Sequence, residues 1–397
     1  MLKCFRDTNF VMLLASNMLI SIVSASYLIV SMALIRDISS DSSVLVAIAP
    51  LFRTLSSVTL GLIAGYIIDR FGARKIMVVS TLLTSLSLCV MAISTRVYLI
   101  YVMLFLTSTF LVVFYRPANN AFIPAVIKSE ELLRVNSILR ALSYVNFIVM
   151  PTLMGVLAEK YNPHILFYAM VLISLASILP LIFIKIQEEK NPCLSTRLSE
   201  IFDGFEYLFR ERAVVTIFLL YMLVMLTTGG INIALNMFVL EELKMGISII
   251  GVLTSIFTGG LILGNFFLGF LKKVSKGRVV TIGILLTGLG YIILSVSSSL
   301  LLIFILQLLL GLFASFIVTP SMTVFQEVVP SNLRGRVFSG ISIFLGLSTL
   351  ISSITVSVLI NFINSRSIIF ACGMITFLLG GTNITLGKLR KRLYKPR

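Results

Sequence analysis

The chain carries few charges, and its cysteines show no pairing pattern. Charged residues make up 12% of the 397 positions, about half of the roughly 25% that is usual in a soluble domain. The four cysteines, Cys4, Cys89, Cys193 and Cys372, have no paired spacing, so we expect neither a disulfide nor a zinc site. We expect no metal ion and no bound cofactor.

The chain is rich in apolar residues, and basic residues outnumber acidic ones. Hydrophobic residues account for 58% of the chain, and the net charge is +16. Nucleic-acid-binding proteins gather their basic residues on a solvated face, whereas here lysine and arginine stand between long apolar runs. We therefore expect a membrane protein that does not bind nucleic acid.

Apolar runs about 20 residues long, the length that crosses a bilayer, recur along the whole sequence. The run from Val279 to Gln326 is long enough for two helices, and the cluster Ser295–Ser299 marks the turn between them. We predict an all-α integral membrane protein with twelve transmembrane helices, no soluble catalytic domain and no enzymatic activity. The other ten predicted spans are Phe10–Ile35, Ser43–Ile68, Ile76–Thr95, Val97–Tyr115, Ala141–Ala158, Ile165–Ile184, Ala213–Leu240, Met245–Leu271, Val337–Ser365 and Ser367–Gly387.

The distribution of lysine and arginine predicts the orientation. Of the 32 basic residues, 26 fall in segments on one side of the predicted membrane and 5 on the other, while Arg53 lies inside a span. Basic residues concentrate in cytoplasmic loops. We predict a multi-pass protein of the cell (inner or plasma) membrane with both termini in the cytoplasm, and we expect a monomer.

The two halves of the chain resemble each other at an offset of about 203 residues, which is typical of parallel repeats in transporters. Pro117 corresponds to Pro320 and Phe122 to Phe325. We predict two six-helix pseudo-repeats, residues 1–184 and 213–397, joined by a cytoplasmic linker at 185–212. The remaining correspondences are Gly65 with Gly269 and Arg134-Val135 with Arg336-Val337.

The loop after the second span contains Gly65-x-x-x-Asp69-Arg70-x-Gly72-x-Arg74-Lys75. This pattern resembles the signature loop of the major facilitator superfamily. The resemblance implies a fold of two six-helix bundles and a loop that gates the cytoplasmic face. A tight turn with cytoplasmic charges is the simpler interpretation. In the second half, Lys273 stands where Asp69 would map, which predicts an asymmetric gate.

A second motif is Tyr115-Arg116-Pro117-Ala118, continuing to Pro124. With Arg334-Gly335-Arg336, it is similar to the macrolide-efflux and siderophore-exporter branch of that superfamily. The resemblance implies export of small amphipathic molecules, and we assign Arg116, Arg334 and Arg336 to the gate. Pro151-x-x-x-Gly155 is similar to the antiporter motif of exporters, although Met150 replaces its usual glycine.

Arg53 is the basic residue predicted deepest in a span, about 15 Å from its start at 1.5 Å per residue. An arginine at that depth costs on the order of 3 kcal/mol, so it usually faces a wet cavity. A guanidinium group suits carboxylate or phosphate, which favours an anionic or zwitterionic substrate. The alternative is an arginine that locks helices together through backbone carbonyls.

Two polar stripes are candidates for the remaining substrate contacts. Residues spaced by three or four positions share one helix face, and in the family the corresponding helices line the central cavity. Ordinary interhelical hydrogen bonding is the alternative. The stripes are Asn17, Ser21 and Ser24 in the first span, and Thr228, Asn232 and Asn236 in the seventh.

These patterns predict a secondary-active exporter of a small amphipathic or anionic metabolite, of the metallophore or siderophore type, working by alternating access. A macrolide or multidrug efflux pump is the first alternative. An importer and a membrane receptor without transport are the others. No acidic residue lies deep in a predicted span, so coupling to the proton gradient lacks its usual carboxylate.

Overall fold

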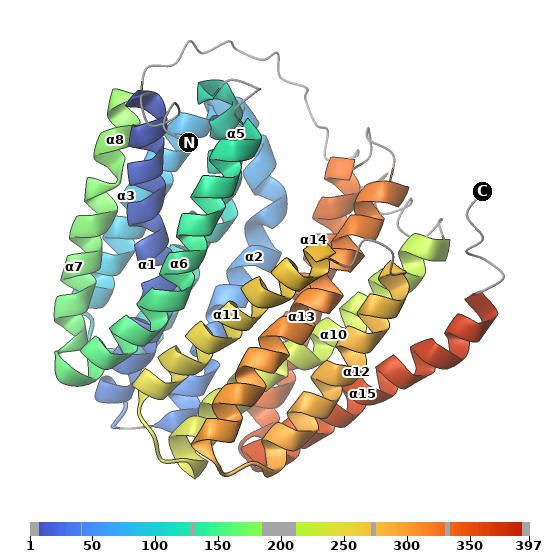
Figure 1. The fold of residues 1–397 in the computed structure, drawn as a ribbon. Coiled ribbons are helices and arrows are strands. Elements are labelled where there is room, and N and C mark those ends of the chain that lie inside the picture. The colour runs from blue at the N-terminus through green and yellow to red at the C-terminus, as the bar shows by residue number, and fades with distance from the viewer. Residues whose placement is uncertain are drawn as a thin grey trace. The chain divides into compact units, whose positions relative to one another are not determined.

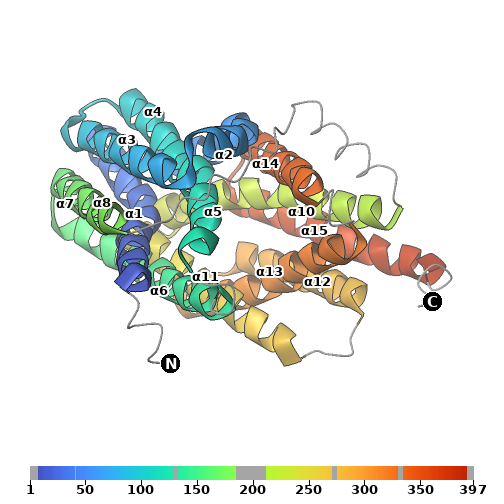
Figure 2. The same cartoon turned by 90° about the horizontal axis from the view of Figure 1, so that it is seen from above.

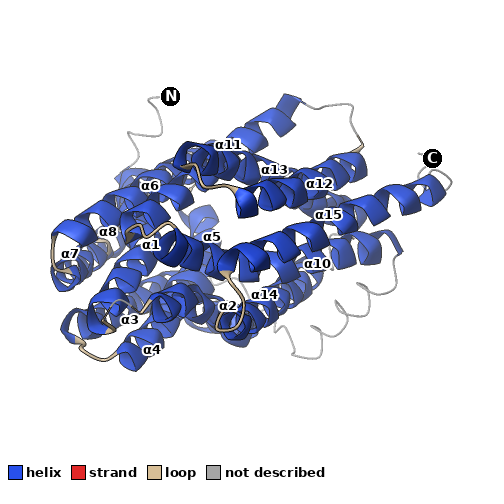
Figure 3. Ribbon diagram, turned by 90° about the horizontal axis from the view of Figure 1, so that it is seen from below, coloured by secondary structure: helices blue, strands red, loops and turns tan. Residues whose placement is uncertain are grey.

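The computed structural model describes residues 8–40, 42–127, 132–184, 212–270, 275–329 and 334–390. Nearly all of the predicted linker, 185–212, lies outside these ranges. Within them, every regular element is a helix (Figure 3). The absence of strands follows from the long apolar runs, because a helix satisfies its own backbone hydrogen bonds in lipid.

Twelve helical segments in the described ranges are long and apolar enough to cross a membrane, which confirms the predicted fold class. The predicted turn in the longest run is also confirmed, since α12 (Lys276–Val296) ends and α13 (Leu300–Val328) begins on either side of Ser297–Ser299.

The helices group into two compact units (Figures 1 and 2). Residues 245–255, at the start of α11, group with the first unit, and the rest of α11 groups with the second. Unit 1 otherwise contains α1 (Thr8–Ile38), α2 (Ser43–Phe71), α3 (Ala73–Ile93), α4 (Val97–Ser108), η2 (Thr109–Tyr115), α5 (Arg116–Val126), α6 (Leu132–Lys160), α7 (Pro163–Ala176) and α8 (Ile178–Phe183). Unit 2 otherwise contains α10 (Arg212–Met237), η3 (Phe238–Glu242), α11 (Ile247–Phe270) from residue 256, α12, α13, α14 (Arg334–Leu359) and α15 (Ser365–Arg390).

Unit 1 is built around α1, which packs against α6, α7 and α2. The helix is mostly buried although it carries many serines, because these hydroxyl groups find partners inside the unit. Ser16 donates to the carbonyl of Ser177 at 2.8 Å, at the break between α7 and α8. The Tyr27 hydroxyl pairs with Ser108 at 2.8 Å.

Unit 2 is held by an apolar cluster and by glycines that allow close helix contact. In it, α12 packs against α15 and α13, and α10 packs against α14. Phe325, the repeat counterpart of Phe122, is fully buried in the cluster, and Phe122 is equally buried in unit 1. Many large apolar side chains are exposed in both units, for example Leu172 in unit 1 and Phe266 in unit 2. An apolar exterior suits a lipid environment.

At two predicted span boundaries the helix continues past an arginine. The fourth span was predicted to end at Tyr115, but it continues through η2 and α5 to Val126. The fifth was predicted to begin at Ala141, but its helix, α6, already begins at Leu132. Each boundary was drawn at an arginine, Arg116 or Arg140, and in both cases that residue is part of the helix.

Candidate functional site

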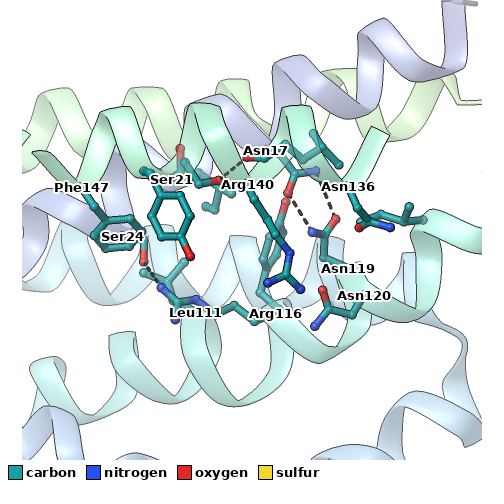
Figure 4. A pocket seen from close by; sticks show the side chains of 16 residues that line it. Asn17, Ser21, Ser24, Leu111, Arg116, Asn119, Asn120, Asn136, Arg140 and Phe147 are labelled. Atoms are coloured by element: carbon teal, nitrogen blue, oxygen red, sulfur yellow. Dashed lines mark hydrogen bonds between the residues drawn. The ribbon is translucent and has the colours of Figure 1, made fainter. Parts of the chain in front are cut away.

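A cavity of about 290 Å³ lies inside unit 1, between α1, the η2–α5 segment and α6 (Figure 4). Its walls combine amide, hydroxyl and guanidinium groups with apolar side chains. The lining residues are Asn17, Ile20, Ser21, Ser24, Leu111, Tyr115, Arg116, Asn119, Asn120, Ile123, Asn136, Leu139, Arg140, Ser143, Tyr144 and Phe147.

The wall contributed by α6 is a helical stripe. Asn136, Arg140, Tyr144 and Phe147 follow one another at intervals of four, four and three residues, so all four lie on one face. The stripe changes from polar to aromatic along the helix. The opposite wall is the predicted stripe of α1, and Asn17, Ser21 and Ser24 all line the cavity.

The third wall owes its geometry to Pro117. Proline has no N–H, and its ring collides with the carbonyl four residues earlier, here that of Val113. The turns before it are accordingly wide, and Thr109–Tyr115 forms a π-helix. Pro117 occupies the first turn of α5, so the span continues past Arg116. In this way Arg116, Asn119 and Asn120 lie on the cavity side.

Two polar contacts fix α1 to the other walls. Asn17 and Asn119 exchange amide hydrogen bonds: Nδ2 of Asn17 donates to Oδ1 of Asn119 at 3.1 Å, and Nδ2 of Asn119 donates to Oδ1 of Asn17 at 2.8 Å. The buried Asn146 side chain donates to the Ser21 hydroxyl. The polar residues of α1 therefore do both things that were considered for them: they form hydrogen bonds to other helices, and they line the cavity.

Arg116, predicted as a gating residue, is part of the cavity wall. Its Nη2 donates to the Ser24 hydroxyl at 3.4 Å. The guanidinium carbon lies 5.7 Å from the centre of the Phe147 ring, within the range of a cation–π contact.

Arg53 is half-buried on α2 and does not line this cavity. Its guanidinium group is near enough to that of Arg116 for the two charges to interact. The described residues provide no hydrogen bond or ion pair to the Arg53 guanidinium group. Arg53 therefore acts on the charge of the cavity's own arginine without lining the cavity.

The predicted stripe of the seventh span lies on α10, in unit 2. The hydroxyl of Thr228 and the amide of Asn232 donate to carbonyls of their own helix, at 3.0 and 3.1 Å. Asn232 is exposed, and Asn236 is buried. Within the described ranges no hydrogen bond joins these three side chains to another helix, and their role in substrate binding stays a prediction.

The predicted gating loop connects α2 to α3. Gly72 has φ +86°, a left-handed conformation that glycine adopts without strain. The Arg74 guanidinium donates to the carbonyl of Ile182 at the end of α8, and Lys75 is exposed. Arg70 lies 5.5 Å from the Phe71 ring centre. The side chains of Asp69, Arg334 and Arg336, together with Gly65, lie outside the described residues.

A close crossing joins α6 to the first residues of α11, within unit 1. A Cβ atom on Gly155 would lie 2.9 Å from Cα of Ser248, and the backbone N–H of Ser248 donates to Oε1 of Glu159 at 2.8 Å. The Thr152 hydroxyl donates to that of Ser255 at 2.8 Å. The Pro151-x-x-x-Gly155 motif thus forms a tight helix contact.

Sequence reasoning missed Arg140, Asn119, Asn120 and Asn136 as cavity residues. Arg140 was counted as a cytoplasmic charge that ends a span. The spacing of Asn136, Arg140 and Tyr144 on one helix face was the available signal. Among the described residues, no group of three His, Cys, Asp or Glu side chains is placed to hold a metal ion.

Comparison with known proteins agrees with this architecture. The family model of the Major Facilitator Superfamily matches residues 14–220 and 217–392, one match for each repeat. The nucleoside transporter NupG superposes with a TM-score of 0.74 at 13% identity over 98% of this chain and 100% of that one, and a mutant of it gives 0.81 at 11% identity over 95% and 99%. At such identities the likeness concerns the fold.

Among proteins of assigned function, macrolide efflux protein A of Streptococcus pyogenes is 22% identical over 334 residues, covering 81% of this chain and 82% of the relative. The protein of the same name from Enterococcus faecalis is 23% identical over 289 residues, covering 69% and 88%. The chain therefore belongs to the major facilitator superfamily, as a multi-pass membrane transporter in a branch similar to the macrolide efflux proteins.

Proposed function

We propose that this transporter exports a small amphipathic metabolite from the cell by alternating access, and that the metabolite is anionic or zwitterionic, as metallophores and siderophores are. The observation that carries the proposal is the composition of the unit 1 cavity. Apolar residues such as Leu111 and Leu139 face it together with amides and arginines, and a solute matched to such walls has both apolar and polar parts. The efflux function of the relatives supports the outward direction.

The position of Arg53 supports the proposal that the substrate is negatively charged. The charge of Arg53 interacts with that of Arg116, and no acidic side chain lines the cavity in the described part of the chain. Metal-chelating metabolites bind hard cations through anionic oxygens, which are the groups that a guanidinium recognises.

Transport in everted membrane vesicles tests this proposal. We expect vesicles containing the wild-type chain to accumulate an anionic metabolite. Arg53→Ala is expected to abolish accumulation, and Arg53→Lys to retain part of it. Metabolite profiling of a deletion strain identifies candidate substrates, because an exported anion accumulates inside the cells. Accumulation in right-side-out vesicles instead would make the chain an importer.

A macrolide efflux pump is the second candidate, favoured by the names of the relatives. For that function we expect lower macrolide susceptibility in cells expressing the chain, and Arg53→Ala should then leave transport unchanged. Arg53→Ala cannot both abolish and preserve the transport of one substrate. Measuring transport with this variant therefore separates the two candidate functions.

The remaining assignments complete the proposal. The loop residues Gly65, Asp69, Arg70, Gly72, Arg74 and Lys75, with Arg334 and Arg336, close the cytoplasmic side of a monomer whose halves are 1–184 and 213–397. The proton gradient is the proposed driving force. Dissipating it with an uncoupler should stop accumulation in vesicles, and continued accumulation would require another ion.

A further inference from the structure

Arg140 is a cavity residue with no role in the function described so far. It lies on α6 one turn from Asn136, is exposed to the cavity, and extends across it toward α5, which carries Arg116 (Figure 4). Its guanidinium group has no hydrogen bond or ion pair to any residue in the described part of the chain. Five N–H donors are thus available to a solute.

Arg116 differs because it is held in place. Ser24 accepts one of its hydrogen bonds and the Phe147 ring lies against its cation. Both partners are neutral, so its charge is not compensated. Phe147 lies seven residues along α6 from Arg140, about 10 Å at 1.5 Å per residue, so the two arginines approach the cavity from different levels and different walls.

The cavity therefore contains two positive charges and, among its lining residues, no negative one. Like charges in a partly enclosed space repel, and screening by water is weaker there than in bulk solvent. A ligand with one negative charge compensates one arginine and leaves the other unpaired. A ligand with two negative charges compensates both.

We infer that Arg116 and Arg140 form a two-point anion site, and that the substrate class is a compact molecule with two negative charges, such as a dicarboxylate with a short apolar body. The inference rests on the proposed function, of which it narrows the substrate. Arg116, which Ser24 and Phe147 hold in place, binds one anionic group of the substrate. The side chain of Arg140 binds the second anionic group. Asn120 and Asn136 supply hydrogen bonds between them.

Three ligands of nearly the same shape but different charge test the site. Adipate, its monoamide and adipamide carry two, one and no negative charges on the same carbon chain. Binding to the purified full-length chain is measured by the rise in thermal midpoint, detected with a maleimide dye that reaches the buried Cys372 on unfolding. We expect adipate to bind about tenfold more tightly than the monoamide, and adipamide not to bind.

Arg140→Gln and Arg116→Gln should each reduce adipate binding to the level of the monoamide, because each removes one of the two charges. Arg96→Gln is the matched control: Arg96 is exposed in a loop, bonded to Tyr98, and its loss should leave the tenfold preference intact. Equal affinity for adipate and its monoamide in the wild-type chain, or a preference that survives Arg140→Gln, would overturn the inference. So would a complete lack of adipate binding.

Failure of this inference is distinguishable from failure of the proposed function. If the binding series behaves as expected but everted vesicles accumulate no dianion, the site stands and export is wrong. If vesicles accumulate an anion at the same rate with wild-type and Arg140→Gln chains, export stands and the two-point site is wrong.

Discussion

The guanidinium group of Arg366, at the start of α15, pairs with the carboxylate of Glu242 at the end of η3. The same guanidinium donates through Nη1 to the carbonyls of Ser295 and Ser297, each at 3.0 Å, and it lies 4.9 Å from the Phe238 ring centre. One arginine thus ties together three segments of unit 2 that are distant in sequence.

Replacing this arginine should destabilise unit 2. Arg366→Ala leaves Oε2 of the part-buried Glu242 and two carbonyls without their donor, while Oε1 of Glu242 keeps the Ser365 hydroxyl and the backbone N–H of residue 366. We expect a loss of about 2 to 3 kcal/mol in unfolding free energy. Arg366→Lys should recover only part, since an ammonium group lacks the planar fork. Thermal unfolding of the purified chain measures both. Arg96→Ala, which removes an exposed arginine, should change stability by less than about 1 kcal/mol; an equal loss in the two alanine variants would contradict the assigned role.

Adjacent glycines in α11 should respond oppositely to alanine. A Cβ atom on Gly260 would overlap the carbonyl of Leu308 on α13, whereas one on Gly259 meets no atom within 4 Å. We expect Gly260→Ala to cost about 1 to 3 kcal/mol through overpacking. Gly259→Ala should be neutral or stabilising, by up to about 1 kcal/mol, because alanine favours helix. Denaturation midpoints of the two variants check the contrast, and similar midpoints would show that the helices do not cross so closely.

The Asn17–Asn119 pair should behave as a single unit. Asn17→Ala removes both bonds of the pair from the Asn119 amide. Asn119→Ala leaves Oδ1 of Asn17 without its donor, while Nδ2 of Asn17 keeps its bond to the carbonyl of Leu13. Each substitution should cost about 1 to 2 kcal/mol. The double variant should cost less than the sum of the single ones. A double-mutant cycle on thermal stability measures this coupling. Additive losses would mean that the amides bond elsewhere, for example to water in the cavity.

The predicted orientation can be tested at the two ends of α3. Phe71 and Thr95 are exposed residues flanking this helix, so we expect them on opposite sides of the membrane. In a chain with its four cysteines replaced, a membrane-impermeant maleimide should label Thr95→Cys in intact cells and Phe71→Cys only after permeabilisation. The reverse pattern would place both termini outside.

The sequence was sufficient to predict the membrane spans, but it predicted only some of the residues that line the cavity. Apolar run length determines where a helix crosses lipid, so the twelve spans and the turn at Ser297 were predictable. The α1 stripe, which the sequence marks as polar residues on a buried helix, lines a cavity. Whether these side chains bind substrate stays a prediction.

Arg116 and Arg140 show why the other cavity-lining residues could not be predicted from the sequence. A charged residue at the edge of an apolar run is typical of a span end, and hydropathy does not reveal that the residue faces a cavity. That distinction depends on which helices pack together. Likewise, the α1 stripe does not reveal that Asn17 pairs with Asn119, which is 102 positions away.

The π-helical turn at Thr109–Tyr115 also sets the rotational phase of everything that follows it. Each such turn holds about one residue more than an α turn, so the segment after it is rotated by about 100° relative to a continuous α-helix. Deleting a single residue here would turn the face carrying Arg116 and Asn119 away from the cavity.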